Sequence, residues 1–291
     1  MSTSPMRRKH LAIPVAIAVL IGCVAPIMVL CVFSVFVVED FDLVTAFSGA
    51  AWKELFTGPT YWFLIGKAVL SGSVTAFLTS IVGYPVTLAL WRLKPSWKGV
   101  GLVMILTPLY TGEIVRIYAW RIVLGGEGLV NSLLMTLGAI DEPLKFLLFS
   151  PFTTALVLLY NNLPYMVLAI WISLEMVDGR LIEAARDLGS RPIEAFWRVV
   201  FPLTVPGLAA GVFSVFALSA GEMMTPMLLG GTTGSTAMAM IDNLFGTAFD
   251  WPMASAFALA LLIGLFVSAG ALAGTLLRIN GGRGLLQQVG S

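Results

Sequence analysis

The feature that most constrains this chain is a set of long apolar segments that contain no charged residue. Four of them are uninterrupted and cover 11–38, 68–90, 146–174 and 251–277. A membrane-spanning helix needs about 20 apolar residues to cross roughly 30 Å of hydrocarbon, and each segment is long enough. Because 58% of all residues are apolar and only 11% are charged, the sequence predicts an all-α polytopic membrane protein.

Two further spans carry interruptions. One covers 199–220 and is followed, after Glu222, by an apolar stretch rich in Gly, Thr and Pro. The other begins at Gly99, passes Pro108 and Gly112, and then meets charged residues while keeping a helical pattern to residue 124. We therefore expect six transmembrane helices, the first of which is an uncleaved anchor.

The orientation follows from the positions of Lys and Arg, because cytoplasmic segments keep the positive charges. An even number of spans puts both termini on one side. If that side is the cytoplasm, the inner segments hold twelve of the 17 basic residues, in the N-terminal tail, at 92–98, at 175–198 and in the C-terminal tail. We therefore expect both termini to be cytoplasmic.

A polar block, EAARDLGSRPIEAFWRVVFPLTVPG, covers residues 183–207 between two apolar runs. Residues 181–188 favour a helix, Gly189 stands where a left-handed C-terminal cap belongs, and Pro192 suits the first position of a second short helix. Helices this short are not stable alone in water. The block therefore needs a partner against which it packs.

The block resembles the EAA loop of bacterial ABC importer permeases. The similarity consists of Glu183-Ala184-Ala185, then Gly189, then the apolar stretch with prolines at 199–207. In that family the loop forms a coupling helix that docks in a groove on a cytoplasmic ATPase, and small residues let the backbones approach closely. The resemblance implies that Glu183, Ala184, Ala185 and Gly189 couple this chain to an ATPase.

The resemblance extends over about residues 61–275, where several stretches are similar to permeases of spermidine/putrescine importers. These stretches are GYPVTLALWR at 83–92, IVRIYAW at 114–120, GLVNSLL at 128–134, LPYMVLAIWISLE at 163–175 and GEMMTPMLLGG at 221–231. Met223-Met224 stands where a Phe-Val type pair is more usual. The similarity implies a type I ABC importer transmembrane domain at 61–275 with its coupling loop at 175–207. An N-terminal part would occupy 1–60 (tail, first helix and periplasmic loop), and a cytoplasmic tail 276–291.

The same resemblance implies a permease subunit in the bacterial inner membrane, which forms the path for a small solute. Its partners would be a periplasmic solute-binding protein, a cytoplasmic ATPase dimer, a second permease subunit and the lipid bilayer. A polyamine is the first candidate for the solute. Opines or amino-acid derivatives, phosphonates and ferric iron are alternatives in related systems.

Patterns for catalysis, metal binding and nucleic-acid binding are missing from the sequence. It contains no GxxxxGK[ST] phosphate loop, one histidine and two cysteines without metal-ligand spacing. We expect no catalytic residue, metal or cofactor in this chain, which would not be an enzyme, and ATP and Mg²⁺ would bind to the partner ATPase. The net charge of +1, with scattered basic residues, argues against binding of nucleic acid.

Polar residues at membrane depth mark a candidate solute path, since a charge at the centre of a span costs roughly 2.5–3.5 kcal/mol on insertion scales. Glu222 lies in the outer half of the fifth predicted span, before Pro and Gly residues that interrupt a helix where exposed backbone can line a cavity. Tyr160 and Asn161 precede Pro164 in a similar polar break. Ammonium groups favour carboxylates and aromatic faces, which predicts a polyamine path at Glu222, Tyr160, Asn161 and Tyr165.

Glu113 and Arg116 leave two interpretations open, because they stand three residues apart. They either form an intrahelical ion pair that holds a kinked helix, or belong to the solute path. Two other functions compete with that of an ABC permease. A secondary transporter would need an internal repeat, which the sequence does not show, and a scaffold without transport activity would leave the intramembrane charges unexplained.

Overall fold

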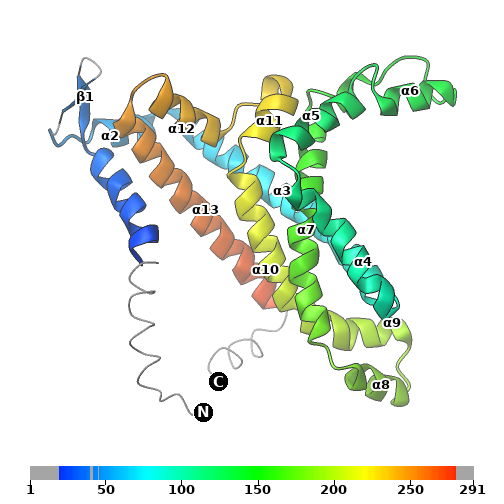
Figure 1. Ribbon diagram of the computed structural model, residues 1–291. Coiled ribbons are helices and arrows are strands. Elements are labelled where there is room, and N and C mark those ends of the chain that lie inside the picture. Colours follow the sequence, from blue (N-terminus) through cyan, green and yellow to red (C-terminus); the bar gives the residue numbers. More distant parts are fainter. Residues whose placement is uncertain (1–19, 40–41, 45, 280–291) are drawn as a thin grey trace, which may run out of the picture. The chain divides into compact units, whose positions relative to one another are not determined.

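The computed structural model describes residues 20–39, 42–44 and 46–279 (Figure 1). Contacts between residues divide the chain into two compact units. The first consists of Met1–Phe63 and Met238–Ile263, and the second of Leu64–Ala237 and Gly264–Ser291. The long helices α3 (Pro59–Trp91) and α13 (Trp251–Ile279) each contribute residues to both units.

The first unit contains a helix over Leu20–Phe33, a two-stranded antiparallel sheet and two short helices. In the sheet, β1 (Val37–Glu39) pairs with β2 (Asp42–Val44), with Val37 opposite Val44. Aromatic contacts hold its parts together: Phe33 lies 6.0 Å from Trp251, and Tyr61 lies 5.2 Å from Phe257, between ring centroids. The short helices are α2 (Ala50–Thr57) and α12 (Ala237–Gly246).

The second unit is built around α7 (Pro151–Glu175) and α10 (Phe201–Ala220), which lie side by side (Figure 1). Gly207 and Gly211 allow the close approach. A Cβ on Gly207 would overlap the carbonyl oxygen of Ala169, and one on Gly211 would lie 2.6 Å from the sulfur of Met166. Small residues at a helix interface are typical of membrane proteins, where close backbone packing drives association.

A buried apolar cluster fills the space around this helix pair. It draws residues from α3, α7, α10, α13 and the turn before α10: Ala76, Met166, Ile170, Leu174, Val200, Val215, Phe216 and Ala269.

Shorter elements connect and extend these helices in the second unit. After α3 come α4 (Pro95–Leu106), the 3-10 helix η1 (Thr107–Tyr110), α5 (Glu113–Leu124) and α6 (Leu129–Thr136). The 3-10 helix η2 (Lys145–Leu147) precedes α7. After α7 come α8 (Gly179–Asp187), α9 (Pro192–Ala195) and a π-helical turn, η3 (Phe196–Val200), and after α10 come α11 (Met224–Leu229) and the 3-10 helix η4 (Gly231–Thr233).

The predicted helical membrane fold is confirmed, with the small sheet of β1 and β2 as an addition that the sequence did not predict, and the number of six spans is not confirmed. Among the described residues, four helices are long and apolar enough to span a membrane: Pro59–Trp91, Pro151–Glu175, Pro192–Ala220 and Trp251–Leu272. A fifth span results if Pro95–Tyr110 and Glu113–Thr136 count as one bent pair. Residues 11–19 of the first predicted span lie outside the described residues, so six spans stays a prediction.

Some expected boundaries differ in the structure. The expected interruption of the span over 99–124 is a bend, where Pro95–Tyr110 and Glu113–Thr136 meet at an angle of 98°. The first helix ends at Phe33 rather than at residue 38, where β1 has begun. α3 begins nine residues before the expected 68 because Lys67 is accommodated in the helix, where its Nζ donates to the carbonyl oxygen of Ser235 at 2.6 Å.

We predict that the termini and the 175–198 loop face the cytoplasm, and that 39–60 and 125–145 face the periplasm. Alkaline phosphatase is active only outside the cytoplasm, so a fusion after Asp141 should be active and a fusion after Arg191 inactive. The reverse activities of these two fusions would contradict the six-span topology.

Candidate functional site

The loop that resembles a coupling helix folds as α8, whose start is fixed by a side-chain cap. Asp178 precedes the helix and its Oδ1 accepts a hydrogen bond from the backbone N–H of Arg180 at 2.9 Å. Such a cap satisfies one of the donors that a helix start leaves without a partner.

The end of α8 confirms the predicted left-handed cap. Gly189 has a φ of +86°, a conformation that disfavours any residue with a Cβ. Its N–H donates to the carbonyl of Arg186 at 2.8 Å, and the N–H of Ser190 donates to that of Ala185 at 3.0 Å. These two bonds are the pair expected of a Schellman motif. A Cβ on Gly189 would have no neighbour within 4 Å in this chain, so only the backbone conformation opposes a substitution here.

An apolar stripe on α8 is exposed. Leu181, Ala184 and Leu188 follow one another at three- and four-residue spacing and therefore share a face, and Leu188 is 88% exposed. Ile182 points the other way, onto the buried cluster beside α7 and α10. Glu183 is exposed and Ala185 is half-buried. The predicted coupling residues therefore lie on a helix anchored on one side and open on the other.

The second half of the loop corrects the expectation of a separate short helix. α9 begins at Pro192, and Glu194 Oε2 accepts a hydrogen bond from the N–H of Arg191 at 3.2 Å. The chain then passes through the π-helical turn η3 into α10 without a break, so Pro192–Ala220 is one continuous span. The helix expected to begin at residue 199 therefore begins at Pro192, because α9, η3 and α10 follow one another without a gap.

The predicted path residues Glu113 and Glu222 meet where two helices break. Glu222 follows the end of α10 at Ala220, rather than lying inside the span as expected, and its Oε1 accepts hydrogen bonds from the N–H groups of Met224 (3.0 Å) and Thr225 (3.2 Å). It thereby caps α11. Its carboxyl group is also hydrogen-bonded to that of Glu113, the first residue of α5 after the 98° bend.

Burial is the main cause that raises the pKa of Glu222 to about 7. The hydrogen bond with Glu113 and the negative charge of that residue act in the same direction, whereas the backbone N–H groups of Thr225 and Met224 act against them. Two carboxyl groups in contact cannot both ionise easily. Glu222 therefore takes up a proton near neutral pH while its carboxyl group contacts that of Glu113.

Arg116 does not form the ion pair with Glu113 that one interpretation required. Within the described part of the chain the structure shows no such pair, and the Nε and Nη1 atoms of Arg116 are buried without a hydrogen-bond partner. Buried N–H donors without an acceptor are unfavourable. The interpretation of an intrahelical ion pair between Glu113 and Arg116 is therefore wrong for the described structure.

The predicted path residues Tyr160, Asn161 and Tyr165 all lie in α7, which is continuous through this region. The ring of Tyr160 meets that of Trp120 on α5 edge to face, 5.4 Å apart, and Asn161 is 8% exposed with no partner for its Oδ1. Tyr165 is 40% exposed. The expected polar break at 160–162 was wrong, because Asn162 donates to the carbonyl of Leu158 (2.8 Å) within a continuous helix.

Sequence reasoning missed a charged contact among α3, α4 and α7. Lys98 Nζ lies 3.7 Å from Glu175 Oε1 and 5.7 Å from the ring centroids of both Trp91 and Trp171. A cation between two indole rings is a favourable arrangement. Because the partners are distant in sequence, no local pattern indicates the contact.

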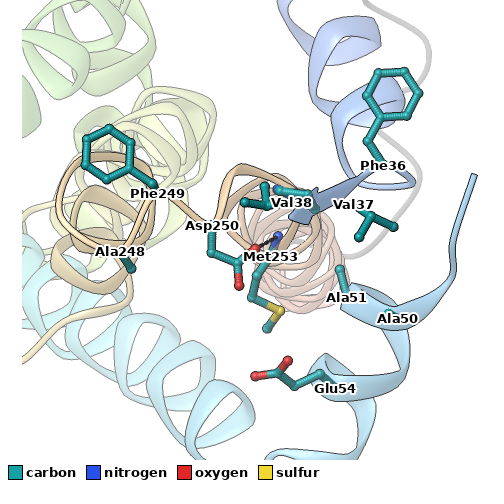
Figure 2. Close-up of a pocket in the computed structure, with 11 residues that line it drawn as sticks. Phe36, Val37, Val38, Ala50, Ala51, Glu54, Ala248, Phe249, Asp250 and Met253 are labelled. Atoms are coloured by element: carbon teal, nitrogen blue, oxygen red, sulfur yellow. Dashed lines mark hydrogen bonds between the residues drawn. The ribbon is translucent and has the colours of Figure 1, made fainter. Parts of the chain in front are cut away.

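The first unit contains a pocket of about 460 Å³, and none of the predicted path residues lines it (Figure 2). Figure 2 shows the carboxylates of Glu54 and Asp250 pointing into it beside Met253. Glu54 accepts a hydrogen bond from the hydroxyl of Tyr61 at 3.1 Å, and Asp250 accepts one from the N–H of Met253 at 3.1 Å. Both carboxylates thus have a structural role within this unit.

Comparison with solved structures defines the class of fold. A crystal structure of a bacterial ABC transporter involved in the import of the acidic polysaccharide alginate matches with a TM-score of 0.71, 15% identity and coverage of 94% of this chain and 96% of that chain. The alginate transporter in complex with an alginate pentasaccharide-bound periplasmic protein matches with a TM-score of 0.67 and 14% identity, covering 95% and 96%.

Sequence comparison then gives the family. Residues 117–278 match the family described as binding-protein-dependent transport system inner membrane component, and the chain belongs to this family. The spermidine/putrescine transport system permease protein PotB of Haemophilus influenzae is 29% identical over 205 residues (70% of this chain, 71% of that protein), and PotB of Escherichia coli is 31% identical (70% and 74%). The inner membrane ABC transporter permease protein YdcU of Escherichia coli is 30% identical over 231 residues (74% and 72%).

The expected identity is therefore confirmed at the level of the family. The chain is a multi-pass inner-membrane protein and a permease subunit of an ABC importer.

Gly189→Val should uncouple the chain from its ATPase. Valine at a φ of +86° is strained by roughly 1–2 kcal/mol, which should distort the end of α8 while leaving every apolar span unchanged. ATPase association and solute-stimulated ATP hydrolysis should fall together, as measured by co-purification and phosphate release.

Gly179→Val is the matched control, because it lies in the same loop with a negative φ and no neighbour within 4 Å of its Cβ. Wild-type ATPase binding and stimulation in Gly189→Val would show that this cap is not part of the coupling element.

Proposed function

We propose that the chain forms the translocation path for a polyamine that a periplasmic binding protein delivers. The contact between the carboxyl groups of Glu113 and Glu222 at two helix breaks carries this proposal, because ammonium groups need negatively charged acceptors inside a protein. The similarity to two PotB proteins supports the same solute class.

The proposed path also includes Tyr160, Asn161, Tyr165 and Arg116. Tyr160 and Trp120 supply aromatic rings where α5 and α7 meet, and such rings attract alkylammonium groups. Asn161 supplies a buried carbonyl oxygen without a partner. The two rings and the Asn161 oxygen would give a cation aromatic surface and an acceptor, whereas Arg116 would repel it.

The proposed partners are a cytoplasmic ATPase dimer, a second permease subunit and a periplasmic binding protein. The exposed apolar stripe of α8 supports an ATPase contact, because Leu181 and Leu188 would otherwise remain in water. The sequence contains no phosphate loop, which supports binding of ATP and Mg²⁺ by that partner rather than by this chain. On this proposal the chain catalyses no reaction, holds no metal or cofactor, and keeps both termini in the cytoplasm.

We place the transmembrane domain at 61–275, with the coupling loop at 175–207 and a C-terminal tail at 276–291. The family match over residues 117–278 lies mostly within the proposed domain. The N-terminal part, 1–60, would then add the first helix together with β1, β2 and α2.

Arg116 favours a second candidate, an amino-acid derivative that carries both an ammonium and a carboxylate. Its buried Nε and Nη1 atoms have no partner, and a guanidinium binds a carboxylate well. Such a solute would place its two charges on Arg116 and on the carboxyl pair.

Uptake by the complete transporter tests whether the solute is a polyamine or an amino-acid derivative. In proteoliposomes with the binding protein supplied, labelled spermidine or putrescine should enter only when ATP is present inside, and the tagged chain should co-purify with an ATPase. Uptake of an amino-acid derivative but not of polyamines would favour the second candidate. Uptake that continues without ATP and follows an ion gradient would contradict an ABC importer.

A further inference from the structure

Three helices of the second unit meet at a small buried apolar cluster. Ile117 on α5, Val157 on α7 and Leu229 on α11 are at most 1% exposed and pack together. Residues four apart in a helix lie on the same face. On each helix, the residue four positions away on the same face is polar. It is Glu113 on α5, Asn161 on α7 and Thr225 on α11.

Hydrogen bonds join two of these polar neighbours to Glu222. Glu113 contacts Glu222, and Glu222 accepts from the N–H of Thr225 at 3.2 Å. On α7, Asn162 donates to the hydroxyl of Ser219 at 3.2 Å, which ties α7 to the last turn of α10. We call the group around Glu222 the junction site: Glu113, Glu222 and Thr225.

One polar atom of the junction site is buried without a partner. Thr225 Oγ1 makes no hydrogen bond in the described structure, and Thr225 is 0% exposed. A buried polar group without a partner is unfavourable. Such an atom beside a carboxyl pair indicates a place where a donor from outside the chain binds.

We propose that the junction site binds one primary ammonium group of the transported solute in exchange for the proton on the Glu222 carboxyl group. This inference rests on the proposed function, because it requires an amine as the solute. It adds the binding geometry and a proton exchange, neither of which the similarity to PotB provides.

The exchange balances in atoms and charge. In the empty site the protonated carboxyl group of Glu222 donates a hydrogen bond to the carboxylate of Glu113, and the pair carries one negative charge. A primary ammonium brings three N–H donors, which match the two carboxylates and Thr225 Oγ1, and the displaced proton leaves to solvent. The net charge is the same before and after, and no covalent bond in the solute changes.

Burial and the contact with Glu113, rather than a neighbouring cation, raise the pKa of Glu222. Arg116 stands one turn after Glu113 on α5, and Tyr160 on α7 lies against Trp120. Neither α10 nor α11 carries a charged or titratable residue. The raised pKa of Glu222, about 7, means that protons displace the amine as the pH falls below 7. Alkylammonium groups stay charged at these pH values, since their pKa lies near that of lysine, about 10.4.

Glutamine substitutions test the junction site in the complete transporter. The amide oxygen of Glu222→Gln can still accept from the N–H groups that cap α11, so the fold should persist. Labelled putrescine is the probe, and its ATP-driven uptake is measured at pH 6, 7 and 8 with saturating binding protein. Every variant is measured with the same binding protein, so a difference between the pH profiles of uptake is caused by the substitution in this chain.

The wild-type rate should rise about tenfold from pH 6 to pH 8, as one group of pKa near 7 loses its proton. Glu113→Gln and Glu222→Gln should each reduce uptake at pH 8 about tenfold and flatten the profile. Glu127→Gln, an exposed carboxylate between α5 and α6, is the matched control and should keep the wild-type profile. Co-purification with the ATPase checks assembly of each variant.

The outcomes separate this inference from the proposed function. Putrescine uptake with a wild-type rate and pH profile in assembled Glu113→Gln and Glu222→Gln would overturn the junction site and leave the polyamine function standing. No putrescine uptake by the wild-type transporter would overturn the proposed function itself. If Glu222→Gln fails to assemble, Glu113→Gln decides alone, because Glu113 caps no helix in the described structure.

Discussion

The close contact between α7 and α10 is the constraint on which the second unit depends. Gly207 and Gly211 let the two backbones approach so closely that a Cβ on either residue would overlap atoms of α7. In lipid, helices gain little from burying apolar surface, so close packing of small residues has to hold them together. The buried cluster that includes Met166 and Phe216 forms around this contact.

Both candidate functional regions are attached to this helix pair. At one end of α7, α8 rests on the same buried cluster through Ile182, and the continuous helix Pro192–Ala220 begins there. At the other end, that helix stops at Ala220 and Glu222 caps α11. A backbone break away from water needs hydrogen-bond partners in the protein, and the Glu222 carboxylate supplies one to Met224 and to Thr225. One helix therefore joins the proposed coupling loop to the proposed junction site.

Local sequence signals predicted much of this structure. Charge-free runs located α3, α7, α10 and α13, because an apolar run of that length has few alternatives in a membrane. The left-handed cap at Gly189 was predictable because glycine adopts a positive φ without strain. The family was also accessible, through the residues of the coupling loop.

The errors concern features that depend on distant contacts. Asn162 does not break α7, because its side chain finds acceptors on Leu158 and Ser219. The contact of Glu113 with Glu222 joins residues far apart in the sequence, so spacing suggested Arg116 as the partner instead. Thr225 was not singled out because a threonine in an apolar stretch gives no signal until its buried, unpaired hydroxyl is seen.

The central claim is that the break after α10 meets the break before α5. Disulfide cross-linking tests this contact directly. Cysteines would replace Glu113 and Glu222 in a chain whose Cys23 and Cys31 are changed to serine, and mild oxidation of membranes would follow. The account predicts rapid formation of an intramolecular disulfide, detected by a reductant-sensitive shift in electrophoretic mobility after alkylation. Failure to cross-link, when the double variant is inserted and assembled with its ATPase, would contradict it.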